Sequence, residues 1–135
     1  MNESENSSFE AADAPAAVEP AETMLASTDN DTRWQGAILL GEFCVTAPET
    51  IWPSVVSWGS SADDDMRAAI ATCVLEHILE HHFAPFFDRS RQIITAGNSA
   101  FADTLSQCWH FGQAELPADK RRLDDLLKQI EPHVT

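Results

Sequence analysis

Apolar residues recur at helical spacing from residue 33 almost to the end of the chain, and no segment shows the two-residue alternation of a strand. Proline, glycine and small polar residues separate the periodic segments. The predicted helices cover about 34–47, 49–58, 63–82, 84–96, 100–111 and 118–130. The pattern therefore predicts an all-α protein of six short to medium helices with tight connections.

The segment 63–82 is the predicted centre of the fold. Its polar side is narrow and consists of Asp65, Thr72, Glu76 and Glu80. A helix that is apolar over more than half of its circumference packs against neighbours on several sides. The expected core residues of this helix are Met66, Ile70, Val74, Leu75 and Leu79. Ser61 or Asp63 is expected to cap its first turn.

Residues 1–30 have a different composition, rich in Glu, Ala, Ser, Pro and Asn. Such a segment buries too little apolar surface to offset the entropy lost on ordering. We expect a disordered acidic N-terminal tail over 1–30 and a helical domain over 31–135. The tail is either an interaction segment or a solubilising leader that contacts nothing.

Tight connections make successive helices antiparallel, so the six helices form about three hairpins. In the segment 51–71, Pro53 stands near the start of a first helix, Asp65 follows the turn, and Arg67 lies in the first turn of a second helix. This segment resembles a unit of the HEAT-repeat and armadillo-like α-solenoids, and a weaker copy extends from residue 83 to residue 105.

The resemblance covers residues 48–112. It implies a short HEAT-like right-handed α-α superhelix of about three antiparallel hairpins that serves as a binding surface for another protein. It also implies structural roles for Asp65 and Arg67 at the central hairpin turn.

The net charge narrows the choice of partners. The chain has 22 acidic and 8 basic residues and a formal charge of −14. Such a chain repels nucleic acid and anionic membranes, so we expect neither as a partner. Cys44, Cys73 and Cys108 form no CxxC pair, and there is no signal-like apolar N-terminus, which favours a reducing, cytoplasmic location.

One helix carries candidate chemistry. Cys73, His77 and His81 are spaced by four residues, so one helical face brings them together as candidate metal ligands. Residues 77–81 also match the H-x-x-E-H string of inverzincin metalloproteases, in which two histidines bind zinc and the glutamate, here Glu80, activates water. That family needs a further downstream ligand and a larger domain, and the chain offers no suitable one.

Three functions therefore remain open. The favoured one is a non-enzymatic protein–protein interaction module, an adaptor or scaffold without catalytic residues or cofactors, with self-association as a further possibility. The first alternative is an acidic inhibitor of a basic partner, of the immunity-protein kind. The second is a metal-dependent hydrolase that uses the H-x-x-E-H string. One of the four tryptophans is expected to be substantially exposed, as a candidate interface residue, and Trp34 and Trp58 are the favoured positions.

Overall fold

The computed structural model describes residues 10–130, and this part of the chain is all-helical, without a strand. The all-α prediction is confirmed. The elements in chain order are the 3-10 helix η1 (Ala11–Asp13), α2 (Ala14–Leu25), α3 (Asn30–Gly41), α4 (Pro48–Gly59), α5 (Asp64–Ile70), the π-helical segment η2 (Ala71–Leu75), α6 (Glu76–His81), α7 (Phe83–Thr95), α8 (Ser99–Ser106), the 3-10 helix η3 (Gly112–Glu115) and α9 (Pro117–Ile130). None of the described helices combines the length and the apolar character needed to cross a membrane.

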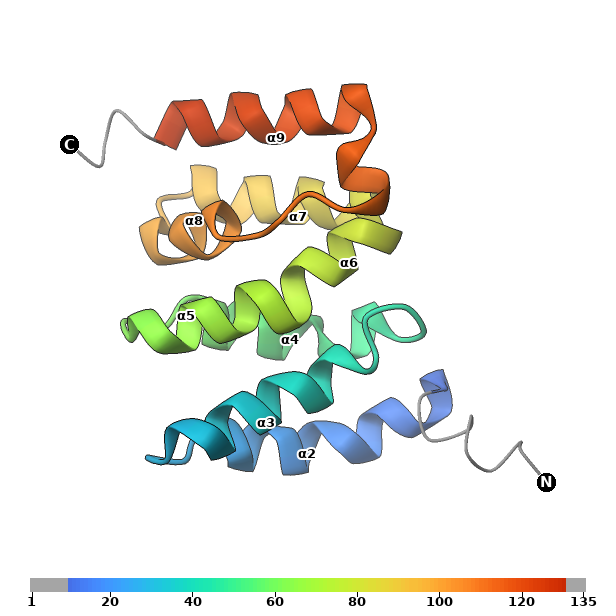
Figure 1. The fold of residues 1–135 in the computed structure, drawn as a ribbon, viewed down its shortest axis with the longest axis vertical. Helices are drawn as coiled ribbons and strands as arrows, with labels where there is room; N and C mark the ends of the chain where they lie inside the picture. The colour runs from blue at the N-terminus through green and yellow to red at the C-terminus, as the bar shows by residue number, and fades with distance from the viewer. Residues whose placement is uncertain (1–9, 131–135) are drawn as a thin grey trace.

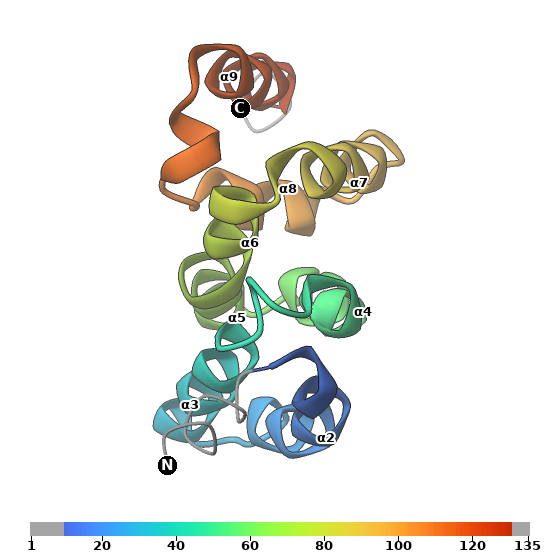
Figure 2. The same ribbon diagram turned by 90° about the vertical axis from the view of Figure 1, so that its right-hand side faces the viewer.

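The helices lie in successive layers along the long axis of the molecule (Figure 1). α2 packs on α3, α4 on α5, and α7 on α8, while α9 covers the end formed by α7 and α8. In the view turned by 90°, α2, α4 and α7 follow one side of the stack and α3, α5 and α6 follow the other (Figure 2). The first two layers thus contribute a first helix to one side and a second helix to the other.

The N-terminal part of the chain differs from the expected disordered tail. Ala14–Leu25 is a helix, and its residues Ala14, Ala21 and Leu25 are buried. A Cβ at Gly36 of α3 would lie 2.9 Å from the Ala21 carbonyl oxygen, so α2 and α3 approach very closely. Small side chains permit this contact, which explains why a segment poor in large apolar residues still packs. Residues 1–9 of the expected tail lie outside the described residues.

The central helix has the expected core but not a regular helical turn throughout. Asp63 caps α5 by accepting from the backbone N–H of Asp65 at 2.8 Å and of Met66 at 3.4 Å. The predicted core residues are all buried: Met66, Ile70, Val74, Leu75 and Leu79. Residues 71–75 then widen into the π-helical segment η2 before α6 begins. The expected single helix over 63–82 is therefore three consecutive segments.

Neighbouring elements pack directly on the backbone of η2. The thiol of Cys44 donates to the Val74 carbonyl at 3.2 Å, and that of Cys108 donates to the Ala71 carbonyl at 3.6 Å. A Cβ at Gly41 would lie only 2.3 Å from the Cys73 carbonyl oxygen. The Ala71 carbonyl also accepts from the backbone N–H of Glu76, five residues later, so these contacts add to the hydrogen bonds of the π-helical turn itself. Two of the three cysteines therefore have a structural role at the centre of the fold.

Candidate functional site

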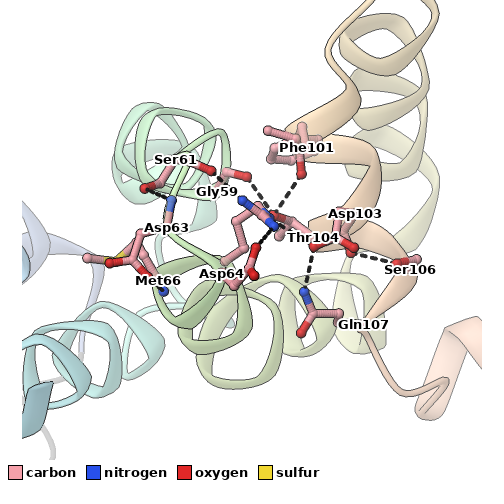
Figure 3. A network of polar contacts seen from close by, with 12 residues as sticks. Gly59, Ser61, Asp63, Asp64, Met66, Phe101, Asp103, Thr104, Ser106 and Gln107 are labelled. Carbon is pink, nitrogen blue, oxygen red and sulfur yellow. Dashed lines mark hydrogen bonds and ion pairs between the residues drawn. The ribbon is translucent and has the colours of Figure 1, made fainter. Parts of the chain in front are cut away.

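Arg67 and Asp65, the two predicted structural residues, lie near the turn between α4 and α5 but have different partners. Arg67 donates through Nη1 to the Ser61 carbonyl at 2.9 Å and through Nε to Asp103 of α8 at 2.8 Å, and it also pairs with Asp64. Figure 3 shows Ser61, Asp64 and Asp103 gathered around this network. Arg67 therefore joins its own turn to the next layer.

Asp65 points to the preceding layer instead. Its Oδ2 accepts from the indole Nε1 of Trp34 at 3.0 Å and lies 3.5 Å from Nη2 of Arg33. The carboxylate that caps the turn belongs to Asp63, which also pairs with Arg33 at 3.5 Å. Asp65 thus links α3 to α5, in the same way that Asp103 links α5 to α8.

These contacts follow an internal repeat that the sequence analysis missed. Ser27-x-Asp29-x-x-x-Arg33 recurs 34 residues later as Ser61-x-Asp63-x-x-x-Arg67. In both copies the serine hydroxyl accepts from the aspartate N–H at 3.0 Å, and the aspartate caps the second helix of its hairpin. In both copies the arginine then pairs with an aspartate of the next layer. The first copy begins at Ser27, within the segment 1–30 for which the sequence predicts a tail.

The third layer keeps the cap and loses the arginine. Asn98 caps α8 by accepting from the Phe101 N–H at 2.9 Å, 35 residues after Asp63. Ala102 takes the place of the arginine and lines a groove of about 390 Å³ between the α7–α8 turn and α9. The groove residues are Ile94, Thr95, Gly97, Asn98, Ser99, Ala102, Leu126 and Gln129. They include no acid, base or thiol.

The candidate metal ligands are not assembled into a site. His77 Nδ1 lies 3.2 Å from Glu80 Oε1, and His81 Nε2 lies 3.7 Å from the same oxygen, whereas Cys73 belongs to η2. Within residues 10–130, no group of three or more His, Cys, Asp or Glu side chains is arranged to hold a metal ion. The widened turn of η2 interrupts the regular α-helical spacing on which the alignment of Cys73 with the histidines depended.

Glu76 is a candidate site residue whose burial differs from the sequence prediction. It was expected on the polar face, but it is 5% exposed. Its Oε1 accepts a hydrogen bond from the backbone N–H of Trp109 at 2.9 Å. Burial raises the pKa of the Glu76 carboxyl, and the hydrogen bond from Trp109 and the nearby His77 oppose that rise. The partner lies 33 residues away in the chain, so no local pattern indicates this burial.

The segment after α8 is held along α6 at three points. α8 ends at Ser106, earlier than the predicted end at residue 111, and the backbone N–H of Trp109 meets Glu76. The ring of Phe111 stacks on that of His77, with centroids 6.4 Å apart and planes within 5°. Gly112 has φ +52, and a Cβ there would lie 2.7 Å from the Glu80 carbonyl oxygen. Only glycine combines that conformation with so close an approach.

We refer to residues 109–112 as the aromatic loop. Trp109 is 70% exposed and Phe111 is 38% exposed, although the backbone of Trp109 is anchored to a buried carboxylate. One tryptophan is exposed, as expected, but it is Trp109 and not Trp34 or Trp58. Both are half-buried against the core, with indole N–H groups bonded to Asp65 and Glu22.

No protein-family model, curated protein or solved structure matches the chain. The candidate site therefore rests on the geometry of the described residues. This site is the aromatic loop beside α6, where the Trp109 side chain is exposed to solvent and its backbone is held by Glu76.

Proposed function

We propose that this chain is a non-enzymatic protein–protein interaction module and that the aromatic loop is its contact surface. The observation that carries the proposal is Trp109, whose side chain is 70% exposed while its backbone N–H is fixed by Glu76. Tryptophan is enriched among the residues that dominate interface energies. A side chain presented by a rigid backbone loses less conformational entropy on binding, which favours affinity.

The proposal includes a HEAT-like architecture, in which the layers form a right-handed superhelix. The repeated Ser-x-Asp-x-x-x-Arg segment and the stacking of successive hairpins support this assignment. Such arrays present an extended surface on the side of their second helices, and α6 with the aromatic loop lies there. All three cysteines are free thiols, in accordance with the cytoplasmic location that we propose.

The metal-dependent hydrolase is the weaker alternative. It requires at least three ligands around one ion, and the described residues do not converge in that way. Self-association remains within the proposal, because a second copy of the chain is also a protein partner for the aromatic loop.

The test compares affinity capture from native lysate by the full chain, by Trp109→Ala and by Val45→Ala. Val45 is the matched control, since it is an exposed apolar residue outside the aromatic loop. The full chain is used because the N-terminal helix α2 packs into the fold and contributes buried residues. Cross-linking before capture retains weak complexes, and mass spectrometry quantifies each partner.

A partner held by the wild type and by Val45→Ala but lost from Trp109→Ala supports the proposal. Equal capture by Trp109→Ala contradicts the assignment of the surface, and absence of any partner contradicts the function. Sedimentation velocity on the same three proteins identifies a dimer that depends on Trp109, in which case the partner is a second copy. Circular dichroism verifies that all three proteins are folded.

A further inference from the structure

We infer that the aromatic loop recognises a cationic partner, namely a protein segment that covers Trp109 and places a lysine or arginine against Glu80. This inference rests on the proposed function and adds the chemistry of the partner. It follows from the charges that surround the loop, from the pairing of the chain's own cations, and from the position of Glu80.

The segments that build this surface contain no lysine or arginine. None occurs between Arg67 and Arg89 or between Arg91 and Lys120, which covers η2, α6, α8 and the aromatic loop. The same segments contain six glutamates and aspartates on either side of the loop: Glu76, Glu80, Asp88, Asp103, Glu115 and Asp119. Asp88 and Asp103 pair with arginines and Glu76 is buried, so Glu80 is the partly exposed carboxylate of α6 that lies at the aromatic loop.

The arginines of the neighbouring layers are engaged elsewhere. Arg33 pairs with Asp63 and Asp65, and Arg67 pairs with Asp103, all at the turn between first and second helices. On α7, Arg89 pairs with Glu49 and Arg91 with Asp88. The guanidinium of Arg122 lies over the Phe87 ring, 4.7 Å from its centroid. In the described part of the chain, none of these cations is bonded to a residue of the aromatic loop or to Glu80.

Glu80 is the carboxylate placed to receive a cation from outside. Its side chain is 29% exposed, and its Cγ is packed beside Gly112 of the aromatic loop. Its Oε1 is the oxygen shared by His77 and His81, so Oε2 has no bond to either. A guanidinium or ammonium group binds such a carboxylate strongly when an aromatic face covers it, because the face adds a cation–π attraction and excludes water.

The charge of the whole chain favours the same kind of partner. At −14, its field attracts a basic segment over several ångströms and repels an acidic one. Such steering raises the association rate and makes it strongly dependent on salt. A cationic segment thus has two advantages at this surface, a faster encounter and a partly exposed carboxylate next to Gly112 of the aromatic loop.

The experiment is selection from a random-peptide phage library on the folded full-length chain, with counter-selection on Trp109→Ala. Peptides that depend on Trp109 and are enriched in lysine and arginine relative to the unselected library are the expected result. Peptides that depend on Trp109 without such enrichment overturn the inference and leave the proposed function standing. If no peptide depends on Trp109, the proposed surface itself is overturned.

The best peptide then separates a specific contact from general attraction to an acidic protein. Its dissociation constant is measured by calorimetry for the wild type, Glu80→Gln and Glu19→Gln, where Glu19 is an exposed carboxylate on α2 and serves as the control. We expect Glu80→Gln to weaken binding by about tenfold and Glu19→Gln by less than about twofold. Equal effects of the two substitutions contradict the placement of the cation at Glu80.

Discussion

Arg67 and Asp103 are bonded across two layers of the structure, with the guanidinium Nε donating to the carboxylate at 2.8 Å. The Arg67 side chain is only 13% exposed, and its other bond closes the turn of its own hairpin at the Ser61 carbonyl. One side chain therefore determines both the local turn and the stacking of the next hairpin. Arg33 has the equivalent position one layer earlier, so the contact is part of the repeat.

A double-mutant cycle between Arg67→Met and Asp103→Asn measures this link. We expect a coupling free energy of about 1 kcal/mol in urea unfolding, because Arg67 is largely buried while Asp103 is half-exposed. Arg91→Met with Asp88→Asn is the matched control, since that ion pair is exposed and lies within α7 alone. A coupling between Arg67 and Asp103 no larger than that of the control pair contradicts a role in stacking.

The pH dependence of stability tests the burial of Glu76. Burial raises the pKa of this carboxyl, so the folded state favours its neutral form. The stabilising effect of the neutral form is complete below the ordinary glutamate pKa of about 4.3 and is lost as the pH rises through the higher pKa of the folded state.

Glu76→Gln keeps an oxygen that accepts from Trp109 and removes the charge. We expect its melting temperature to exceed that of the wild type at neutral pH, with a difference that shrinks toward acidic pH. Differential scanning calorimetry across this range measures it, and Glu19→Gln controls for the change in net charge. A Glu76→Gln protein less stable than the wild type at neutral pH shows that the charged hydrogen bond outweighs the cost of burial.

The packing of α2 can be tested by Gly36→Ala. This substitution is expected to raise the free energy of unfolding if residues 1–30 form a tail and to lower it if α2 packs on α3. If residues 1–30 were a tail, Gly36→Ala would stabilise α3 by about 1 kcal/mol through helix propensity. With α2 in place, the new Cβ lies 2.9 Å from the Ala21 carbonyl, so we expect a destabilisation of about 1–3 kcal/mol. Urea unfolding gives the sign, and Gln35→Ala at the neighbouring exposed position is the control.

The fold was predictable from sequence where large apolar residues carry the packing. The core of α5, η2 and α6 and the Asp63 cap follow from local periodicity and capping chemistry. The packing of α2 does not follow from these signals. Its contact with α3 depends on small residues such as Ala21 and Gly36, and small residues do not distinguish a packed helix from a polar tail by composition. The repeat that ends in Arg33 and Arg67 is visible in the sequence and would have placed α2 in the first hairpin.

The candidate site was less predictable, for a different reason. Trp109 was expected inside a helix over 100–111, but α8 ends at Ser106 and the chain then follows α6. The exposed position of Trp109 and the burial of Glu76 both accompany one long-range contact, the hydrogen bond from the Trp109 backbone N–H to the Glu76 carboxylate. Periodicity describes which side of a helix faces a neighbour, and it does not indicate where a helix gives way to a loop held by tertiary contacts.

The thiols provide a test of the packing on η2. Burial raises the pKa of all three thiols, to about 12 for Cys44, but Cys73 is only half-buried whereas Cys44 and Cys108 are buried. Because the thiolate is the reactive form, we expect iodoacetamide to modify Cys73 at least about tenfold faster than the other two under native conditions. Mass spectrometry of the modified peptides gives the three rates. Comparable rates before unfolding contradict the close packing of Cys44 and Cys108 on the η2 carbonyls.

Two tryptophan substitutions separate a binding role from a stabilising one. Trp52 packs against Phe86 and Phe101, with ring centroids 5.1 and 6.2 Å apart, so Trp52→Ala is expected to cost about 3 kcal/mol. Trp109 is 70% exposed, so Trp109→Ala is expected to change the free energy of unfolding by less than about 0.5 kcal/mol. Urea unfolding measures both, and acrylamide quenching reports the loss of the most accessible indole in Trp109→Ala.

A large loss of stability in Trp109→Ala contradicts the role that we assign to this side chain, because it shows that the indole is used for folding. Unchanged stability together with loss of the captured partner is the combination that only a binding residue produces. Exposing an indole in water carries a free-energy cost that a partner removes when it covers the ring. Glu76 holds only the backbone N–H of Trp109, so the two substitutions Glu76→Gln and Trp109→Ala test the loop and the indole separately.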